Sequence, residues 1–175
     1  MKNGDVVLNV GANIGAHTIL MSKLVGDSGK IFSFEANPKT YSFLQANICI
    51  NNASNIISYN KAAFSEEKQL DFISLEGEGL NLGASFVSPQ DNSWRESTIH
   101  FKPQLGKASK ITVDAIRIDD LLRNVTKIDL IQIDIEGSEP PAIYGAKDLI
   151  PSLIINYSNT RNYKSALSHP FLSFL

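Results

Sequence analysis

The sequence predicts one α/β domain built on a mostly parallel β-sheet. Two observations predict this fold class: short apolar and β-branched runs alternate with segments of helical periodicity, and the first run passes through a glycine-containing turn into a helix. The 175 residues are enough for one hydrophobic core, whereas a second domain would be undersized. We therefore expect a single domain over residues 1–175.

The first part of the chain, residues 1–65, is predicted to contain two strand–helix units and a third strand. The expected strands are 6–10, 30–35 and 55–60, and the expected helices are 16–25 and a segment that carries Tyr41, Leu44 and Ile48 on one face before Asn51. Two successive units of this kind favour a parallel sheet with right-handed crossovers. This half is therefore predicted to be Rossmann-like.

The middle of the chain, residues 66–118, differs from this pattern. Residues 69–75 and 111–118 alternate like antiparallel strands, and residues 76–96 are rich in Gly, Asn and Ser without a period. We interpret it as a loop-rich insertion, and expect the choice of any substrate to depend mainly on residues 76–110.

The last part, residues 119–175, is expected to return to the parallel sheet. The pattern predicts a short helix from Asp119, a buried strand over 128–135, a helix over 138–147 and a fifth strand over 151–156. Only 19 residues follow Asn156, too few for a further helix and two strands. The open edge of the fifth strand would then be a site for association with a second copy of the chain.

Composition excludes several classes of protein. Sixteen basic and eighteen acidic side chains give a net charge of −2, which disfavours a nucleic-acid binder. The lone Cys49 excludes an intrachain disulfide and a cysteine-rich zinc site. No run of eighteen apolar residues and no signal-like start occurs, so we expect no membrane span and a cytoplasmic protein.

The turn from Gly11 to Gly15 is a candidate ligand loop. Glycines allow a sharp turn and bring helix N–H groups against a ligand. A dinucleotide fingerprint would have glycine where this chain has Asn13, whose side chain would crowd a pyrophosphate. A ligand with a carboxylate and a ribose, such as S-adenosylmethionine, fits better. A plain turn that uses glycine only for its geometry is the alternative.

Glu35 ends the second predicted strand, twenty positions after Gly15. A carboxylate at this place can accept hydrogens from both ribose hydroxyls. The alternative is a solvated glutamate at a strand end. The spacing from the glycine turn favours a nucleoside ligand.

A second acidic cluster follows the predicted strand 128–135. Asp134 and Glu136 have the period-two spacing that directs both to one side of an extended strand, and Gly137 permits a turn after them. For Glu139, a functional role and a purely structural role, in which its charge interacts with the helix dipole near the first turn of the following helix, are equal alternatives. In methyl transfer the carboxylates would stabilise cationic groups or accept a proton, in an order the sequence leaves open. A divalent cation bound by the same carboxylates is a further alternative.

Four other residues receive structural interpretations. His17 is expected to pack and hydrogen-bond within its helix, Trp94 to anchor a loop, and Ser85 to satisfy backbone groups in a turn. Lys61 is expected to be a solvated charge.

Together these segments resemble the FkbM family of S-adenosylmethionine-dependent methyltransferases. The likeness extends to about residue 156, and GAN-x-G and DIEG-x-E are its most specific parts. The segments that carry it are LNVGANIGAHT (8–18), FEANP (34–38), AAFS (62–65), IDDLL (118–122) and IDLIQIDIEGSE followed by GA (128–146).

The resemblance implies a class I methyltransferase fold, with its carboxyl-terminal strands missing or shortened here, and O-methylation, usually of a sugar hydroxyl. The residues it implies are Gly11, Asn13 and Gly15 around the methionine portion, Glu35 at the ribose, and Asp134, Glu136 and Glu139 around the reacting centre. Family members usually have aspartate at Asn9, where this chain keeps an acceptor but loses a charge that would help hold the cofactor's ammonium. They usually have glutamate at Asn156, on the acceptor side.

We therefore expect a methyltransferase that uses S-adenosylmethionine and a small-molecule or saccharide acceptor, and no metal. An S-adenosylmethionine-binding module without catalysis is the first alternative, since Asn9, Asn156 and the short carboxyl end depart from the family pattern. An NAD-dependent oxidoreductase, suggested only by the strand–helix units with Glu35, is the second.

Overall fold

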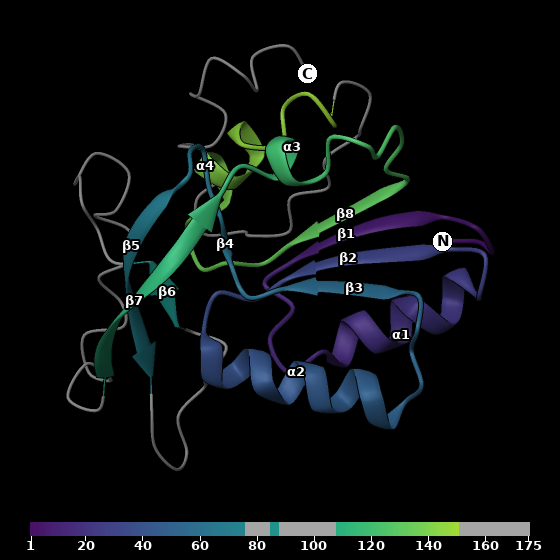
Figure 1. The fold of residues 1–175 in the computed structure, drawn as a ribbon, viewed down its shortest axis with the longest axis horizontal. Coiled ribbons are helices and arrows are strands. Elements are labelled where there is room, and N and C mark those ends of the chain that lie inside the picture. The colour runs from purple at the N-terminus through teal and green to yellow at the C-terminus, as the bar shows by residue number, and fades with distance from the viewer. Residues whose placement is uncertain (76–84, 88–107, 151–175) are drawn as a thin grey trace.

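The structure, a computed structural model, describes residues 1–75, 85–87 and 108–150 (Figure 1). The first sheet is parallel, in the order β3 (Ile56–Tyr59), β2 (Lys30–Phe34), β1 (Val6–Val10) and β8 (Leu130–Ile133). The second sheet is mixed, in the order β4 (Ala62–Ala63), β7 (Ala108–Ile116), β5 (Lys68–Leu75) and β6 (Phe86–Val87). The helices in these ranges are α1 (Ala16–Val25), α2 (Pro38–Ile50), α3 (Ile118–Leu121) and α4 (Glu139–Tyr144).

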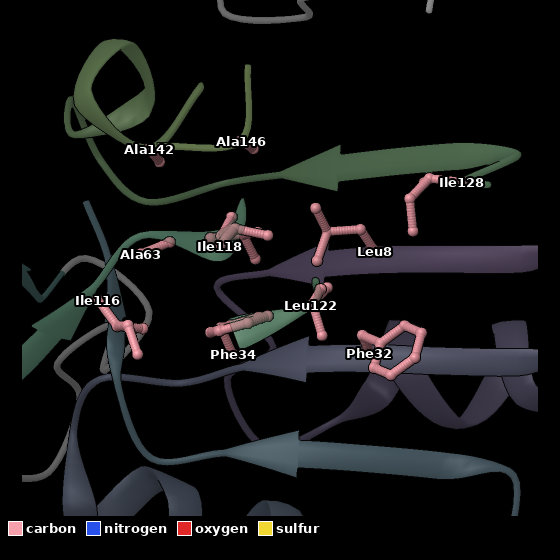
Figure 2. Packing of buried hydrophobic residues seen from close by; sticks show 11 residues of the cluster. Leu8, Phe32, Phe34, Ala63, Ile116, Ile118, Leu122, Ile128, Ala142 and Ala146 are labelled. Carbon is pink, nitrogen blue, oxygen red and sulfur yellow. The ribbon is translucent and has the colours of Figure 1, made fainter. Parts of the chain in front are cut away.

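Helices cover both faces of the first sheet. Successive side chains of β1 point to opposite sides, and because both sets include buried apolar residues, each face needs a covering layer. Val7 packs with Met21 of α1, and the partly buried Ile48 of α2 lies against the same cluster. Leu8 packs on the other side with Ile118 of α3 and Ala142 of α4 (Figure 2). The sheet is thus the middle layer of a three-layer sandwich.

Three neighbouring strands, β2, β1 and β8, end level with one another. Val10 of β1 is the register partner of Phe34 in β2 and of Ile133 in β8. The residues that follow these strands therefore meet at one edge of the sheet. The second sheet stands beside this edge (Figure 1).

The start of α2 shows how the local sequence fixes a helix. The Asn37 side chain accepts hydrogen bonds from the N–H groups of Lys39 and Thr40, and Pro38 occupies the first turn, where no N–H is needed. By contrast, α1 begins at Gly15 in the left-handed conformation and has no side-chain cap.

Most of the predicted elements are confirmed. The helix expected at 16–25 and the strand at 6–10 have those bounds, and the next two strands are each one residue shorter at one or both ends. The alternating segments pair as the antiparallel strands β5 and β7.

Two expectations are corrected in the last part of the chain. The strand expected over 128–135 spans only 130–133 and is half-buried rather than buried; within the described ranges it pairs on one side only, with β1. The helix expected over 138–147 spans only 139–144, and Gly145, which follows it, lies so close to the Phe64 carbonyl that no side chain fits there.

The predicted fifth strand and Asn156 lie outside the described residues. Within the described part of the chain, no helix has the length and apolar character needed to cross a membrane.

Leu8 provides a test of the core. It is fully buried, so Leu8→Ala should lower the free energy of unfolding by about 2–5 kcal/mol, through lost burial and the cavity left behind. Leu20→Ala, at a position that is 56% exposed, is the control and should change it by less than about 0.5 kcal/mol. Urea denaturation measures both, and equal effects would contradict this assignment of the core.

Candidate functional site

A cavity of about 370 Å³ lies where β1, β2 and β8 end, and residues of the second sheet close its far side. We call it the strand-end cavity. Its volume is within the range of small-molecule sites. Its lining includes Gly11, Asn13, Ala16, His17, Glu35, Thr40, Lys61, Phe72, Ser85, Val87, Gln132, Asp134 and Glu136.

The glycine turn closes one side of this cavity and is fixed by the neighbouring strand. The N–H groups of Gly11 and Ala12 both donate to the Phe34 carbonyl, at 2.9 Å. Gly11 has a φ of 83°, and a side chain there would collide with the carbonyl oxygen of Asp134. Glycine at position 11 therefore lets the ends of β1 and β8 come together.

Glu35 is held by two backbone N–H groups from different segments. Its Oε2 accepts from Asn13 at 2.9 Å, and its Oε1 accepts from Asn37 at 2.9 Å. Burial raises the pKa of the Glu35 carboxyl, and the hydrogen bonds from Asn37 and Asn13 partly offset that rise. Because each carboxylate oxygen can accept a second hydrogen bond, the fixed carboxylate can still bind two hydroxyls.

Asp134 and Glu136 both line the cavity, as expected. They do not lie on an extended strand, however, so the period-two spacing is not the reason that they share a side. β8 ends at Ile133, and Glu136 has a left-handed φ of 52°, followed by Gly137 at 99°. This conformation costs a glutamate about 1–2 kcal/mol. The strained turn lies at the cavity, where backbone strain is typical of functional sites.

Asn9 is a predicted cofactor residue that does not line the cavity. It is 1% exposed, its Oδ1 accepts from the Thr18 hydroxyl at 2.6 Å, and its Nδ2 donates to the Gln132 side chain. The amide ties β1 to α1 and β8, and it donates to Gln132, whereas a carboxylate could only accept. Its role in cofactor binding stays a prediction.

Gly15 also lies outside the lining. Its φ of 93° starts α1, and a side chain there would approach Leu44 of α2 at 2.6 Å. The residue thus allows α1 and α2 to pack closely beside the cavity, whereas direct contact with a ligand stays a prediction.

Glu139 is brought beside the acidic turn but not into the cavity lining. It is 3% exposed, and its Oε1 accepts from the Ile135 N–H at 3.2 Å. Oε2 is buried without a hydrogen-bond partner in the described structure. Burial raises the pKa of this carboxyl; backbone hydrogen bonds partly offset the rise, and the Asp134 charge adds a smaller increase. Through its hydrogen bond to Ile135, Glu139 therefore helps to fix the turn that carries Glu136.

Sequence reasoning missed several lining residues. His17, Ser85 and Lys61, which received structural interpretations, line the cavity. The Lys61 ammonium is 3.9 Å from Asp114. Phe72 and Val87 come from the second sheet, and only their apolar character was visible in the sequence.

Two further expectations concern Trp94 and metal binding. Trp94 lies outside the described residues. No group of three or more His, Cys, Asp or Glu side chains in the described ranges is arranged to hold a metal ion.

Comparison with known proteins gives a family match over most of the chain. Residues 9–172 match the model of the methyltransferase FkbM domain. Methyltransferase 1 of Beauveria bassiana is 24% identical over 166 residues, which cover 89% of this chain and 65% of that protein. Methyltransferase sdnD of Sordaria araneosa is 24% identical over 168 residues, 85% of this chain and 62% of that protein. The chain thus spans just under two thirds of the length of these curated relatives.

A solved structure supports the fold. The methyltransferase FkbM from Methylobacillus flagellatus superposes with a TM-score of 0.55 at 17% identity, covering 85% of this chain and 30% of that one. At this identity the likeness concerns the arrangement of helices and strands.

Glu139 gives a pH-dependent prediction. Because its pKa is raised in the fold, its contribution to stability is present below its ordinary value of 4.5 and is lost as pH rises through the raised value. The melting temperature of Glu139→Gln should therefore rise relative to that of the wild type as pH increases from about 4 to about 8. Glu67→Gln removes an exposed carboxyl and is the matched control. A difference for Glu139→Gln that is constant with pH would contradict the raised pKa.

Proposed function

The chain belongs to the FkbM methyltransferase domain family, and on that premise we propose that the strand-end cavity binds S-adenosylmethionine for methyl transfer to a hydroxyl group of a saccharide or glycan-like acceptor. One observation carries this proposal. Gly11, Glu35 and Asp134, which follow three neighbouring parallel strands, line one cavity at the edge where open α/β sheets bind ligands.

The residues of the cavity fit the parts of this cofactor. Glu35 offers two oriented oxygens to the ribose hydroxyls. The first turn of α1 has no side-chain cap, and its residues Ala16 and His17 line the cavity, so its N–H groups are available to a carboxylate. Asp134 and Glu136 offer negative charge to the cofactor's ammonium and sulfonium.

Bound S-adenosylmethionine supplies a methyl group on a cationic sulfonium. In such a transfer the acceptor oxygen would take the methyl carbon, the sulfur would keep the electron pair of the broken carbon–sulfur bond, and a carboxylate of the chain would accept the hydroxyl proton. We assign the two tasks, proton acceptor and partner of the cationic groups, to Asp134 and Glu136 as a pair. Phe72, Ser85 and Val87 of the facing wall would contact the acceptor.

A hydroxyl acceptor fits these carboxylates, because a hydroxyl must lose its proton as it attacks and a nearby carboxylate can accept it. The saccharide class comes from the FkbM resemblance, in which sugar hydroxyls are the usual acceptors.

Isothermal titration of the chain with S-adenosylhomocysteine tests the cofactor assignment. We expect saturable binding of this ligand and none of NADH. No heat from S-adenosylhomocysteine on the folded chain would contradict the proposal. Binding without labelled-methyl transfer to any hydroxyl acceptor would favour a binding module instead.

Glu35→Gln should weaken S-adenosylhomocysteine about tenfold to a hundredfold, because hydrogen bonds to a charged acceptor contribute about 1.5–3 kcal/mol. Burial raises the Glu35 pKa, and hydroxyl donors favour the ionised carboxylate, so wild-type affinity should rise as pH increases through that pKa. The variant should lack this rise. Unchanged affinity in Glu35→Gln would contradict the assignment of the ribose to Glu35.

The acidic pair is tested by labelled-methyl transfer to a panel of saccharides. Replacing both residues, as Asp134→Asn with Glu136→Gln, should slow transfer by about 10²-fold or more, the usual contribution of a general base. Asp120→Asn combined with Glu67→Gln, which removes two exposed carboxylates away from the cavity, is the charge-matched control. Full activity in the double variant would rule out both carboxylates as the proton acceptor.

A further inference from the structure

We propose that Asn37 is a positioning residue that couples the carboxylate of Glu35 to the second sheet through the hydroxyl of Ser74. The inference rests on the proposed function, in which Glu35 binds the cofactor ribose. It adds a connection between the cofactor side of the cavity and its facing wall.

Asn37 uses its backbone and side chain for three separate tasks. Its N–H donates to Glu35 Oε1 at 2.9 Å, and its Oδ1 accepts from the first turn of α2. Its Nδ2 donates to Ser74 Oγ at 2.9 Å. At 5% exposure these groups are shielded from water, so each bond restricts the orientation of the residue.

Ser74 connects this residue to the wall of the cavity. It lies on β5 and is 3% exposed. Phe72, two residues earlier, shares its face of the strand and lines the cavity. Phe72 is also the register partner of Val87 on β6, another lining residue. The Asn37–Ser74 bond therefore fixes the position of the Phe72–Val87 wall relative to Glu35.

Coupling of this kind acts in both directions. If the wall orients Asn37, and Asn37 orients the ribose-binding carboxylate, the bond to Ser74 strengthens ligand binding at Glu35. By linkage, a ligand on Glu35 also stabilises the wall. Cofactor binding would thus prepare the surface that contacts the acceptor.

A double-mutant cycle tests the coupling with S-adenosylhomocysteine as the ligand. Ser74→Ala should weaken binding about threefold to tenfold in the wild-type background, but by less than about twofold in Glu35→Gln, because its effect passes through Glu35. Ser42→Ala is the matched control: it removes an exposed hydroxyl that donates within the first turn of α2, and it should leave affinity unchanged in both backgrounds.

An equal loss in both backgrounds, or no loss from Ser74→Ala, would overturn the coupling while leaving the proposed function intact. No binding to the wild type would instead overturn the proposed function, and the coupling with it. If Ser74→Ala does not fold, Asn37→Ser replaces it, because serine can cap α2 but is too short to reach Ser74.

Hydrogen exchange measures directly whether ligand binding stabilises β5, which affinity alone does not report. S-adenosylhomocysteine should slow amide exchange at Leu70 and Phe72 of β5 in the wild type and in Ser42→Ala, but not in Ser74→Ala. Equal protection of β5 in Ser74→Ala would overturn the coupling.

Discussion

The close approach of the ends of β1 and β8 is the constraint on which the rest of the site depends. The Gly11 backbone lies against the Asp134 carbonyl, so no side chain can stand at position 11. Parallel pairing then brings the residues after β1, β2 and β8 to one edge of the sheet. The carboxylate that follows β2 and two from the turn after β8 consequently line one cavity. Hydrogen bonds to neighbouring backbone groups hold Glu35 and Glu139 in fixed positions beside it.

The two sheets contribute different chemistry to the cavity. The parallel sheet supplies N–H groups and carboxylates at its strand ends, as in other open α/β folds. The second sheet supplies the facing wall, with Phe72 and Val87 paired across β5 and β6. Buried polar contacts such as Asn37 to Ser74 join the two parts. Because such contacts are shielded from water, they are electrostatically stronger than the same contacts at the surface.

The sequence was informative where function depends on local pattern. Periodicity located β1 and α1, and their order predicted that Gly11 and Glu35 would meet. It was less informative where tertiary partners decide orientation. Asn9 turns to Thr18 and Gln132, and Glu139 turns to the Ile135 N–H, for reasons that no local pattern encodes. The lining role of Lys61 and Phe72 likewise depends on how the second sheet meets the first, which involves contacts distant in sequence.

We propose Glu35 as the ribose partner in a cofactor site formed by three strand ends. A crystal structure of the protein with S-adenosylhomocysteine soaked into the crystal would locate the ribose. Both ribose hydroxyl oxygens should lie about 2.5–3.0 Å from the Glu35 carboxylate, with the amino-acid tail towards the first turn of α1. A ligand bound elsewhere, or a ribose turned away from Glu35, would contradict it.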